Sequence, residues 1–137
     1  MNLNALLDRP MYYHMDGTPY TGSRTQQTLA WARDFENRIE NGRIIGQESL
    51  MTGVWVSTVW LGLDHGLGVG RPLFFETGVF VEGFGPFQID MLDQDRWSSK
   101  RDAKLGHAEL VKKYSHWKYV FVVFWLQVRR IFSDRKP

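Results

Sequence analysis

Apolar positions in residues 25–40 recur at three- and four-residue steps, which is the spacing of one helix face, and they predict a helix there. The side chains of this expected face are Leu29, Ala32, Phe35 and Ile39. Either Ser23 or Thr25 can cap its first turn, because a hydroxyl oxygen accepts from the unpaired backbone N–H groups. Asn41 and Gly42 can end it, since both residues tolerate the left-handed conformation of a C-cap.

The next segment, residues 43–97, predicts β structure. Its runs are rich in β-branched and aromatic residues, and turn residues separate them. The expected strands cover residues 43–50, 54–61 and 73–81, and residues 87–91 with 92–97 form a last hairpin arm. We expect antiparallel pairing because the connections are too short for parallel crossovers.

A second helix is expected over residues 99–114, capped by Ser98 or Ser99. Gly106 inside it costs about 1 kcal/mol relative to alanine, which is typical of a close approach to a neighbouring element. Residues 117–132 contain an apolar run of strand length that also has helical spacing, and we favour a helix. The sequence therefore predicts an α+β fold with a small antiparallel sheet flanked by two or three helices.

The length of 137 residues predicts a single domain over residues 1–137. Residues 1–23 form a turn-rich N-terminal arm, in which Met11, Tyr12 and Tyr13 can dock on the core or form a short edge strand. Residues 115–137 form a basic, apolar C-terminal segment.

The lack of a signal peptide and of a long apolar run favours an intracellular protein. The absence of cysteine excludes disulfides, thiol catalysis and thiolate zinc sites.

The net charge of +2 conceals an asymmetry along the chain. Residues 1–95 contain 6 Lys and Arg against 12 Asp and Glu, whereas residues 96–137 contain 11 basic and 3 acidic residues. The basic segment either docks on the acidic part of the same fold or meets an acidic partner. Such a partner is a nucleic acid, a membrane surface or an acidic protein.

Two neighbouring segments carry a distinctive motif, which reads VSTVWLGLDHG over residues 56–66 and GRPLFFET over residues 70–77. The chain also has a Tyr-rich opening, a Trp-bearing helix and an Arg-Trp-Ser segment before a helix. Together with the motif, these features resemble a family of small uncharacterised tailed-phage and prophage proteins. The other matching segments here are Met11–Tyr13 with Asp16 and Gly17, Leu29–Glu36, Arg96–Ser99 and Ala103–His107. The resemblance covers roughly residues 11–110. It implies a phage or prophage origin and a place in the cytoplasm of the infected bacterial host, and it brings no established activity with it.

Two departures from this family bear on the partner. The second helix is usually acidic in the family, whereas here it carries Lys100, Arg101 and Lys104. The chain after Lys113 lies outside the shared pattern. A partner common to the family is therefore not implied for this chain.

Four polar residues form the sharpest candidate for chemistry: Asp64, His65, Glu76 and His107. If the third strand and the second helix are neighbours, two imidazoles and one or two carboxylates can converge. Such a set suits zinc or another divalent metal, or a general acid–base pair, and predicts a small metal-assisted hydrolase. The alternative is that these groups only brace the local structure, with Arg71 and Arg96 as carboxylate partners. The sequence has no dense metal-binding motif.

Glycine occupies every second position of one loop, at Gly66, Gly68 and Gly70, just before Arg71. The loop superficially resembles a phosphate cradle, but a strand is expected next, so no helix N-terminus receives the phosphate. Its backbone N–H groups can still surround a ligand.

Aromatic residues make up 15% of the chain, and a domain of this size cannot enclose all of them. The expected ligand or partner contacts are Gly66, Gly68, Gly70, Arg71, Phe84, Phe87, Arg96, Trp97, Trp117, Trp125, Arg129 and Arg130. Exposed rings anchor protein interfaces, and beside cations they stack on nucleic-acid bases. An apolar run with basic flanks, as in residues 115–137, is also typical of helices that lie on membranes or bind a partner.

The sequence thus favours a phage-encoded accessory binding protein that acts on a host component, such as a defence or regulatory factor, by occupying a surface. A host protein is the expected partner, and an acidic surface, nucleic acid, a nucleotide and a membrane surface are alternatives. No cofactor is expected. Two other hypotheses are the metal-assisted hydrolase, which needs a divalent metal, and a protein that sequesters a nucleotide without turnover. The oligomeric state is left open.

Overall fold

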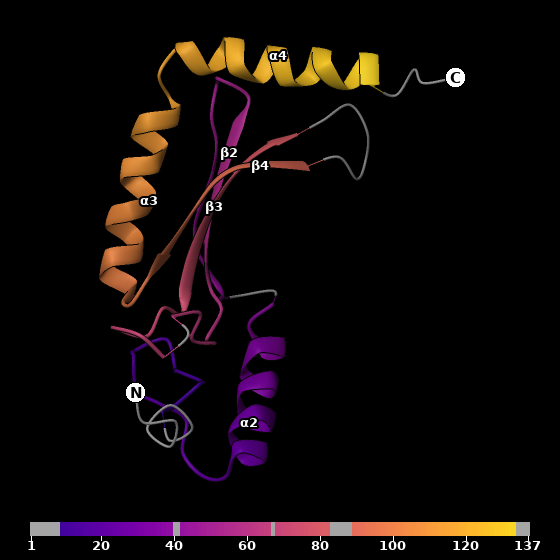
Figure 1. Cartoon of the computed structure of the whole chain (residues 1–137). Coiled ribbons are helices and arrows are strands. Elements are labelled where there is room, and N and C mark those ends of the chain that lie inside the picture. Colours follow the sequence, from indigo (N-terminus) through magenta and orange to yellow (C-terminus); the bar gives the residue numbers. More distant parts are fainter. Residues whose placement is uncertain (1–8, 40–41, 67, 83–88, 134–137) are drawn as a thin grey trace.

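A computed structural model describes residues 9–39, 42–66, 68–82 and 89–133 of the chain (Figure 1). Its elements are, in order, α2 (Arg24–Asn37), β1 (Ile44–Ser49), β2 (Val54–Trp60), β3 (Phe75–Glu82), β4 (Ile89–Trp97), α3 (Lys100–Tyr114) and α4 (Lys118–Ser133). The strands form one antiparallel sheet in the order β1-β2-β3-β4. The predicted α+β class, the antiparallel pairing and the helical state of the C-terminal segment are confirmed.

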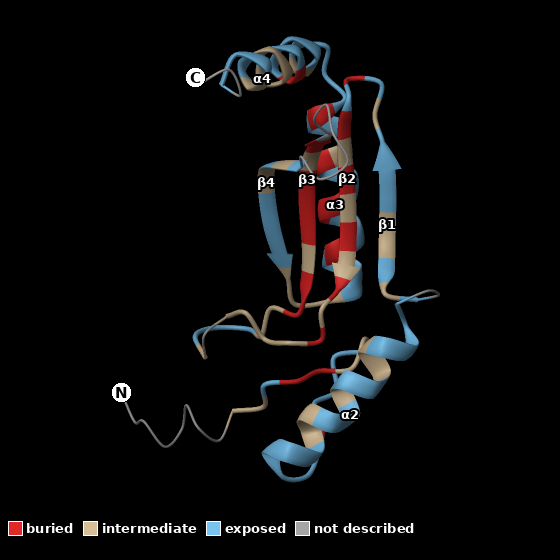
Figure 2. Cartoon of the chain, turned by 90° about the vertical axis from the view of Figure 1, so that its right-hand side faces the viewer, coloured by how far each residue is buried: buried red, intermediate tan, exposed pale blue. Residues whose placement is uncertain are grey.

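One face of the sheet is buried, and the alternation along β2 shows which. Val54, Val56, Thr58 and Trp60 are buried, and the residues between them are half-buried. Thr58 pairs with Thr77, so the corresponding face of β3 is buried with it. Helix α3 covers this face, and Figure 2 shows α3 behind the sheet with the opposite face toward the viewer.

Helix α3 begins at an N-cap, where the Ser99 side chain accepts from the N–H of Asp102. Its buried residues follow helical spacing on one face: Ala103, Gly106, His107, Leu110 and Tyr114. Two core clusters lie along this face. One includes Leu110 with Val123 of α4, and the other includes Trp60 with Ala103.

Helices α4 and α2 lie at opposite ends of the sheet (Figures 1 and 2). Val123, the buried residue of α4, packs on Gly53 in the turn between β1 and β2. At the other end, Tyr12 and Tyr13 are buried and form isolated bridges with Leu63 and Pro19. The expected docking on the core is confirmed for Tyr12 and Tyr13, whereas Met11 is exposed. None of the helices in the described part of the chain is both long and apolar enough to cross a membrane.

The face predicted for the first helix is confirmed only at Phe35, which packs against a core cluster, and is wrong at the other three residues. Leu29, Ala32 and Ile39 are exposed, and α2 has no buried residue. The helix instead turns Trp31 toward the sheet end. The indole Nε1 donates to the backbone oxygen of Leu61 at 2.9 Å, and the ring stacks on Tyr12. An indole gains both a hydrogen bond and a ring contact there, which an aliphatic side chain cannot, and this orients α2.

Candidate functional site

Asp64 braces the loop that follows β2. Its Oδ1 accepts the backbone N–H groups of Gly66 at 2.7 Å and of Leu73 at 2.9 Å, while Oδ2 lies 3.0 Å from Nη2 of Arg9. The neighbouring His65 donates its backbone N–H to the oxygen of Leu73 at 2.8 Å. Both carboxylate oxygens are therefore engaged, and they hold the two ends of the loop together.

Glu76 lies on the face of the sheet opposite to α3. Its Oε2 lies 3.1 Å from Nε of Arg96, and the side-chain amide of Gln94 donates to the same oxygen. Its neighbour Thr77 is buried under α3, and successive side chains of a strand point to opposite faces. The carboxylate of Glu76 thus forms a cross-strand ion pair on the side away from α3.

His107 lies on the inner side of α3, so the structure does not bring it together with Glu76. Asp64 is held in its loop, and the four residues of the expected cluster do not form one pocket. In the described ranges, no group of three or more His, Asp or Glu side chains could hold a metal ion. The arrangement is that of local bracing, which was the alternative stated for these residues.

A buried chain of hydrogen bonds joins the sheet to α3. The indole Nε1 of Trp97 donates to Thr77 Oγ1 at 2.9 Å. The two threonine hydroxyls of Thr77 and Thr58 lie 2.6 Å apart, and Thr58 Oγ1 lies 2.8 Å from Nδ1 of His107. The other ring nitrogen, Nε2, lies 3.4 Å from Oε1 of Glu48, outside hydrogen-bond geometry.

The donors in this chain fix the tautomer of His107. If Thr77 donates to Thr58 and Thr58 donates to Nδ1, each hydroxyl proton has an acceptor, and the N–H at Nε2 faces the carboxylate of Glu48. The reverse direction gives the proton of Thr77 no partner in this chain and turns a lone pair of Nε2 toward a negative charge. We therefore assign Nδ1 of His107 as the acceptor from Thr58 and place the ring proton of this tautomer on Nε2.

Replacing Thr58 with valine, which has nearly the same shape, is expected to lower the free energy of unfolding by about 1–3 kcal/mol. The substitution removes the hydroxyl and leaves the polar groups of Thr77 and His107 without their buried partner. Chemical denaturation measures the change. Ser57→Ala, on the opposite face of the same strand, is the control and is expected to stay within about 0.5 kcal/mol of the wild type. An equal loss in both variants would contradict the assigned network.

The glycine-rich loop is shaped by backbone conformations that favour glycine. Gly68 and Gly70 have φ values of 77° and 68°, in the left-handed region. The N–H of Gly66 already donates to Asp64, and the next element is β3 rather than a helix. Among the described residues of this loop, Val69, Gly70 and Arg71 are exposed.

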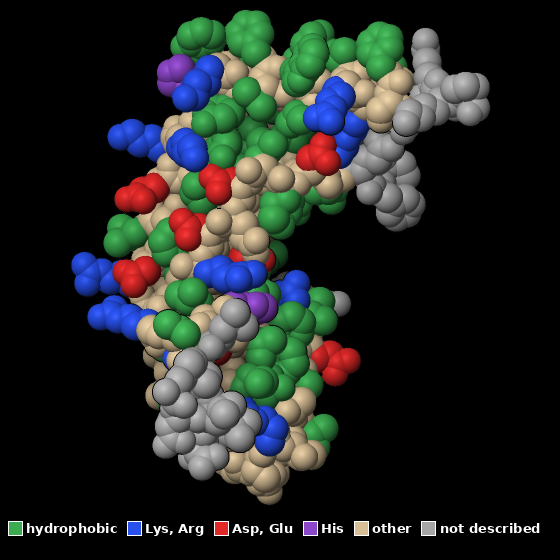
Figure 3. Space-filling model, in the orientation of Figure 1, with side chains coloured by type: hydrophobic (Ala, Val, Ile, Leu, Met, Phe, Trp, Pro, Cys, Tyr) green, Lys and Arg blue, Asp and Glu red, His purple; other side chains and the backbone are tan. Residues whose placement is uncertain are grey.

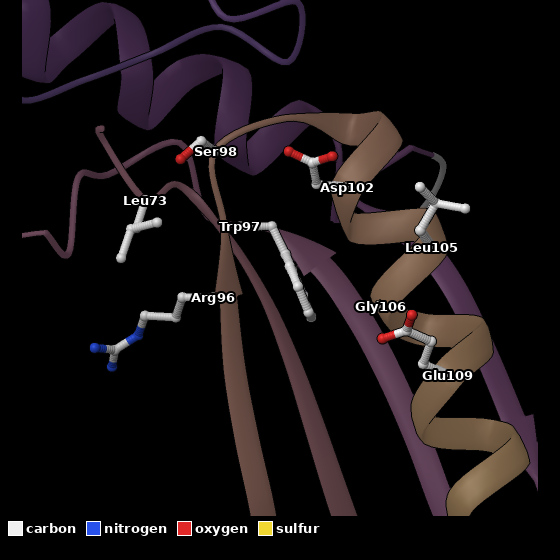
Figure 4. A pocket seen from close by; sticks show the side chains of 8 residues that line it. All are labelled: Leu73, Arg96, Trp97, Ser98, Asp102, Leu105, Gly106 and Glu109. Carbon is white, nitrogen blue, oxygen red and sulfur yellow. The ribbon is translucent and has the colours of Figure 1, made fainter. Parts of the chain in front are cut away.

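A shallow hollow of about 320 Å³ lies where the end of β4 meets the first turns of α3 (Figure 4). Trp97 is turned inward here, and its ring points toward Gly106 on the helix. Arg96 points away from α3 in this view and is the ion-pair partner of Glu76. Trp97, expected as a partner contact, is thus engaged inside the fold.

The outer side of α4 and the turn before it expose a row of aromatic rings. The α4 aromatic face consists of Trp117, Phe121, Phe124, Trp125 and Phe132, whose exposed fractions are 64–68%. Trp117, Phe121 and Trp125 are four residues apart in turn. Phe124 lies three residues after Phe121, and Phe132 lies seven after Trp125, so the rings share one side of the helix. Figure 3 shows hydrophobic side chains along the outer edge of α4, away from the body of the molecule.

The inner side of α4 is fixed to the sheet. Tyr119, Val123 and Leu126 pack against the core cluster at this end, and Arg130 forms an ion pair with Asp90 of β4. Arg130 was expected to contact a partner, and its guanidinium is used within the fold. Arg129, its neighbour, is exposed.

The corner between α3 and α4 is held by Asp93 of β4. The hydroxyl of Tyr114 donates to Asp93 Oδ2 at 2.7 Å, and Nζ of Lys113 lies 3.2 Å from the same oxygen. The hydrogen bond from Tyr114 lowers the pKa of Asp93, and burial raises the pKa of Tyr114 to about 12. Thr52 adds a hydrogen bond to the backbone oxygen of Tyr114 at 2.9 Å. These contacts set the direction in which α4 leaves the body.

Sequence reasoning found part of this face. It named Trp117 and Trp125 and omitted Phe121, Phe124 and Phe132. The four-residue step from Trp117 to Trp125 could have identified Phe121, and steps of three and seven residues from Phe121 and Trp125 could have identified Phe124 and Phe132. Two further expected contacts, Phe84 and Phe87, lie outside the residues that the structure describes.

Comparisons of the chain with protein-family models, with curated proteins and with solved structures gave no match. They therefore supply neither a family nor a functional relative.

Proposed function

We propose that this protein is a binding protein that engages another component through the α4 aromatic face and does not act on it chemically. The observation that carries the proposal is the row of exposed rings on a helix whose other side is fixed to the sheet. The resemblance to tailed-phage proteins supports the remainder of the proposal: a phage-encoded accessory protein whose target is a host component, reached by surface occupation.

The extent of the exposed face supports binding. A large aromatic side chain buries roughly 150–250 Å² when it is enclosed. At 64–68% exposure, five such rings present on the order of 500–800 Å² of apolar surface. The largest apolar patch of a typical monomer is about 300–600 Å² and is often functional. The α4 aromatic face is therefore as large as, or larger than, the largest apolar patch of a typical monomer.

The way the face is presented also supports binding. Aromatic side chains lose little conformational freedom on contact, and they dominate the energetic centres of interfaces. The packing of Val123 and the corner at Tyr114 hold α4 in place before any partner arrives. A pre-formed surface avoids the entropic cost of ordering a segment on binding.

The alternative functions find less support in the contacts. The hydrolase hypothesis needs convergent carboxylates and imidazoles, but Asp64 is used in its loop and Glu76 in an ion pair with Arg96. The nucleotide-sequestering hypothesis needs free N–H groups in the glycine-rich loop, and that of Gly66 is occupied. These contacts favour structural roles for the polar candidates.

A paired substitution tests the proposed function. Phe121→Gln with Phe124→Gln removes two rings that are each 64% exposed and keeps residues that favour helices. In bacterial cells that produce the chain, the wild type is expected to sediment with a larger cellular component in a sucrose gradient of the lysate. The paired variant is expected to move to the position of the isolated chain.

The matched control removes apolar side chains of similar exposure elsewhere. Leu29→Gln with Ile39→Gln changes α2 and the turn after it, where these residues are 63% and 51% exposed. This control is expected to sediment like the wild type. If wild type, variant and control all sediment as the isolated chain, the proposed function is wrong.

A further inference from the structure

We infer that the component bound by the α4 aromatic face is an anionic lipid surface, on which α4 lies flat. This inference rests on the proposed function, because it names the partner of the same face. It begins from the placement of α4 at one end of the molecule.

The geometry suits a helix that lies in the plane of a membrane surface. Helix α4 runs across the end of the sheet, and its aromatic face is directed away from every other element (Figures 1 and 3). A flat surface can therefore reach all the rings of this face at once. Aromatic side chains are enriched at the boundary between lipid chains and headgroups, and helices with one apolar face lie along that boundary.

The charge of the chain segment that carries this face has one sign. Between Leu110 and Ser133 the sequence has five basic residues and no acidic one: Lys112, Lys113, Lys118, Arg129 and Arg130. Lys113 and Arg130 pair with carboxylates of β4. The other three are exposed and form no ion pair with any residue that the structure describes. Lys118 and Arg129 lie on α4 itself, so a negatively charged headgroup layer complements both the rings and their flank.

A hollow at the corner of α3 and α4 gathers three lysines beside one carboxylate, that of Glu109. It has a volume of about 390 Å³ and is lined by Glu109, Lys112, Lys113, His116 and Lys118. Lysine ammonium groups bind phosphate as point charges. Trp117 lies between His116 and Lys118 in the chain, so the hollow adjoins the start of the aromatic face. A headgroup can therefore contact the lysines while the adjoining rings contact its lipid.

The same charges argue against a second copy of this chain as the occupant. If two α4 helices packed face to face in antiparallel directions, Lys118 of one copy would approach Arg129 of the other. In the parallel direction, Lys118 would approach its own counterpart. Both arrangements bring like charges together, and no acidic residue of α4 is available among those described to offset them.

The length of α4 argues for a position along the surface rather than across it. A helix of 16 residues is roughly 24 Å long, whereas the hydrocarbon core is about 30 Å thick. The inner side of α4 is also occupied by the sheet through Val123. Only the outer side is available to lipid.

Flotation with vesicles tests the inference on the purified full chain. The two probes are vesicles of phosphatidylcholine and vesicles in which about a third of the lipid is phosphatidylglycerol. We expect at least about 10-fold tighter binding to the anionic vesicles. This difference should fall as NaCl is raised from about 0.1 M to about 1 M, because the Debye length shrinks from about 10 Å to about 3 Å.

Two paired variants separate the contributions of rings and charges. Phe121→Gln with Phe124→Gln should weaken binding to both kinds of vesicle by on the order of 10-fold for each ring. Lys112→Gln with Lys118→Gln should weaken binding to the anionic vesicles alone, by about 5-fold for each lysine. The matched controls, Leu29→Gln with Ile39→Gln and Lys100→Gln with Lys104→Gln, should bind like the wild type. If the phenylalanine pair does not fold, Trp125→Gln alone serves the same purpose.

The outcomes distinguish this inference from the proposed function. Weak and equal binding to both kinds of vesicle overturns the lipid partner. If a detergent-resistant complex that depends on Phe121 and Phe124 is then still seen in the gradient, α4 binds a protein and the proposed function stands. A concentration-dependent dimer that the phenylalanine pair abolishes makes a second copy the occupant and also overturns the lipid partner.

Discussion

Replacing Trp60 with alanine is expected to lower the free energy of unfolding by about 3–5 kcal/mol. Trp60 is 1% exposed and ends β2. Its ring belongs to a core cluster with Tyr13, Phe75 and Ala103, so one side chain joins the N-terminal segment, the sheet and α3. Its removal leaves a cavity that separate elements would have to close, and partial collapse of such a cavity recovers little of the lost packing.

The effect of this substitution should be largest near α2. The indole Nε1 of Trp60 donates to the backbone oxygen of Tyr13 at 3.2 Å, and the guanidinium of Arg38 lies 5.6 Å from the ring centroid. The ring of Phe35 lies 6.3 Å away. Because α2 has no buried residue, its position depends on contacts of this kind. We expect amide hydrogen exchange to rise more in α2 than in α3.

Chemical denaturation with a matched control checks this expectation. Trp55→Ala changes a half-buried tryptophan on the opposite face of the same strand, where its ring contacts Phe80. Its removal is expected to cost about 1–2 kcal/mol, because the site is already partly open to water. A loss for Trp60→Ala no greater than that for Trp55→Ala would show that Trp60 does not join these elements.

The course of the chain could be predicted because it depends on local patterns. The strand of residues 54–61 is β-branched and aromatic, and β2 covers Val54–Trp60. The helix of residues 99–114 has a serine cap, and α3 begins after Ser99 as expected. The short connections determined the antiparallel order. Each of these signals acts within a few residues, and so it can be read without the rest of the fold.

The candidate site could not be predicted in the same way, because it depends on which way side chains point. Glu76 and Thr77 are neighbours, and a shift of one residue in the strand exchanges the outer and the buried face. The hypothesis of a cluster with His107 needed Glu76 on the buried face, where Thr77 lies. The sequence of β3 is apolar on both sides of this position, and so its pattern does not choose a face.

The same limit applies to α4. Its apolar residues surround the helix, so the sequence does not indicate that Val123 packs inward while Phe121 and Phe124 remain outside. The size of a side chain does not indicate which residue packs inward either. The inward position is taken by valine, which is smaller than the rings, because the turn of the sheet at Gly53 lies close to it. Only the packed structure shows which rings remain for a partner.

Replacing Gly106 with alanine is expected to lower the free energy of unfolding by about 1–3 kcal/mol, although helix propensity alone would raise it by about 1 kcal/mol. A Cβ at this position would lie 2.0 Å from Cζ2 and 2.2 Å from Cη2 of Trp97. Carbon atoms in contact are normally about 3.5–4.0 Å apart. The glycine expected from the sequence to permit a close approach is thus the point where α3 meets a tryptophan ring.

The ring cannot move aside freely to admit this methyl group. Its Nε1 donates to Thr77, and Thr77 continues through Thr58 to His107 on the same helix. Displacing the indole therefore strains the polar chain that joins the sheet to α3.

Ala108→Gly, at an exposed position of the same helix, calibrates the propensity and should cost about 1 kcal/mol. Adding Trp97→Phe to Gly106→Ala should relieve the clash, so that the pair loses less stability than the two single variants together. Additive losses in this cycle, or a gain in stability for Gly106→Ala alone, would mean that the Trp97 ring does not determine how closely α3 packs on the sheet.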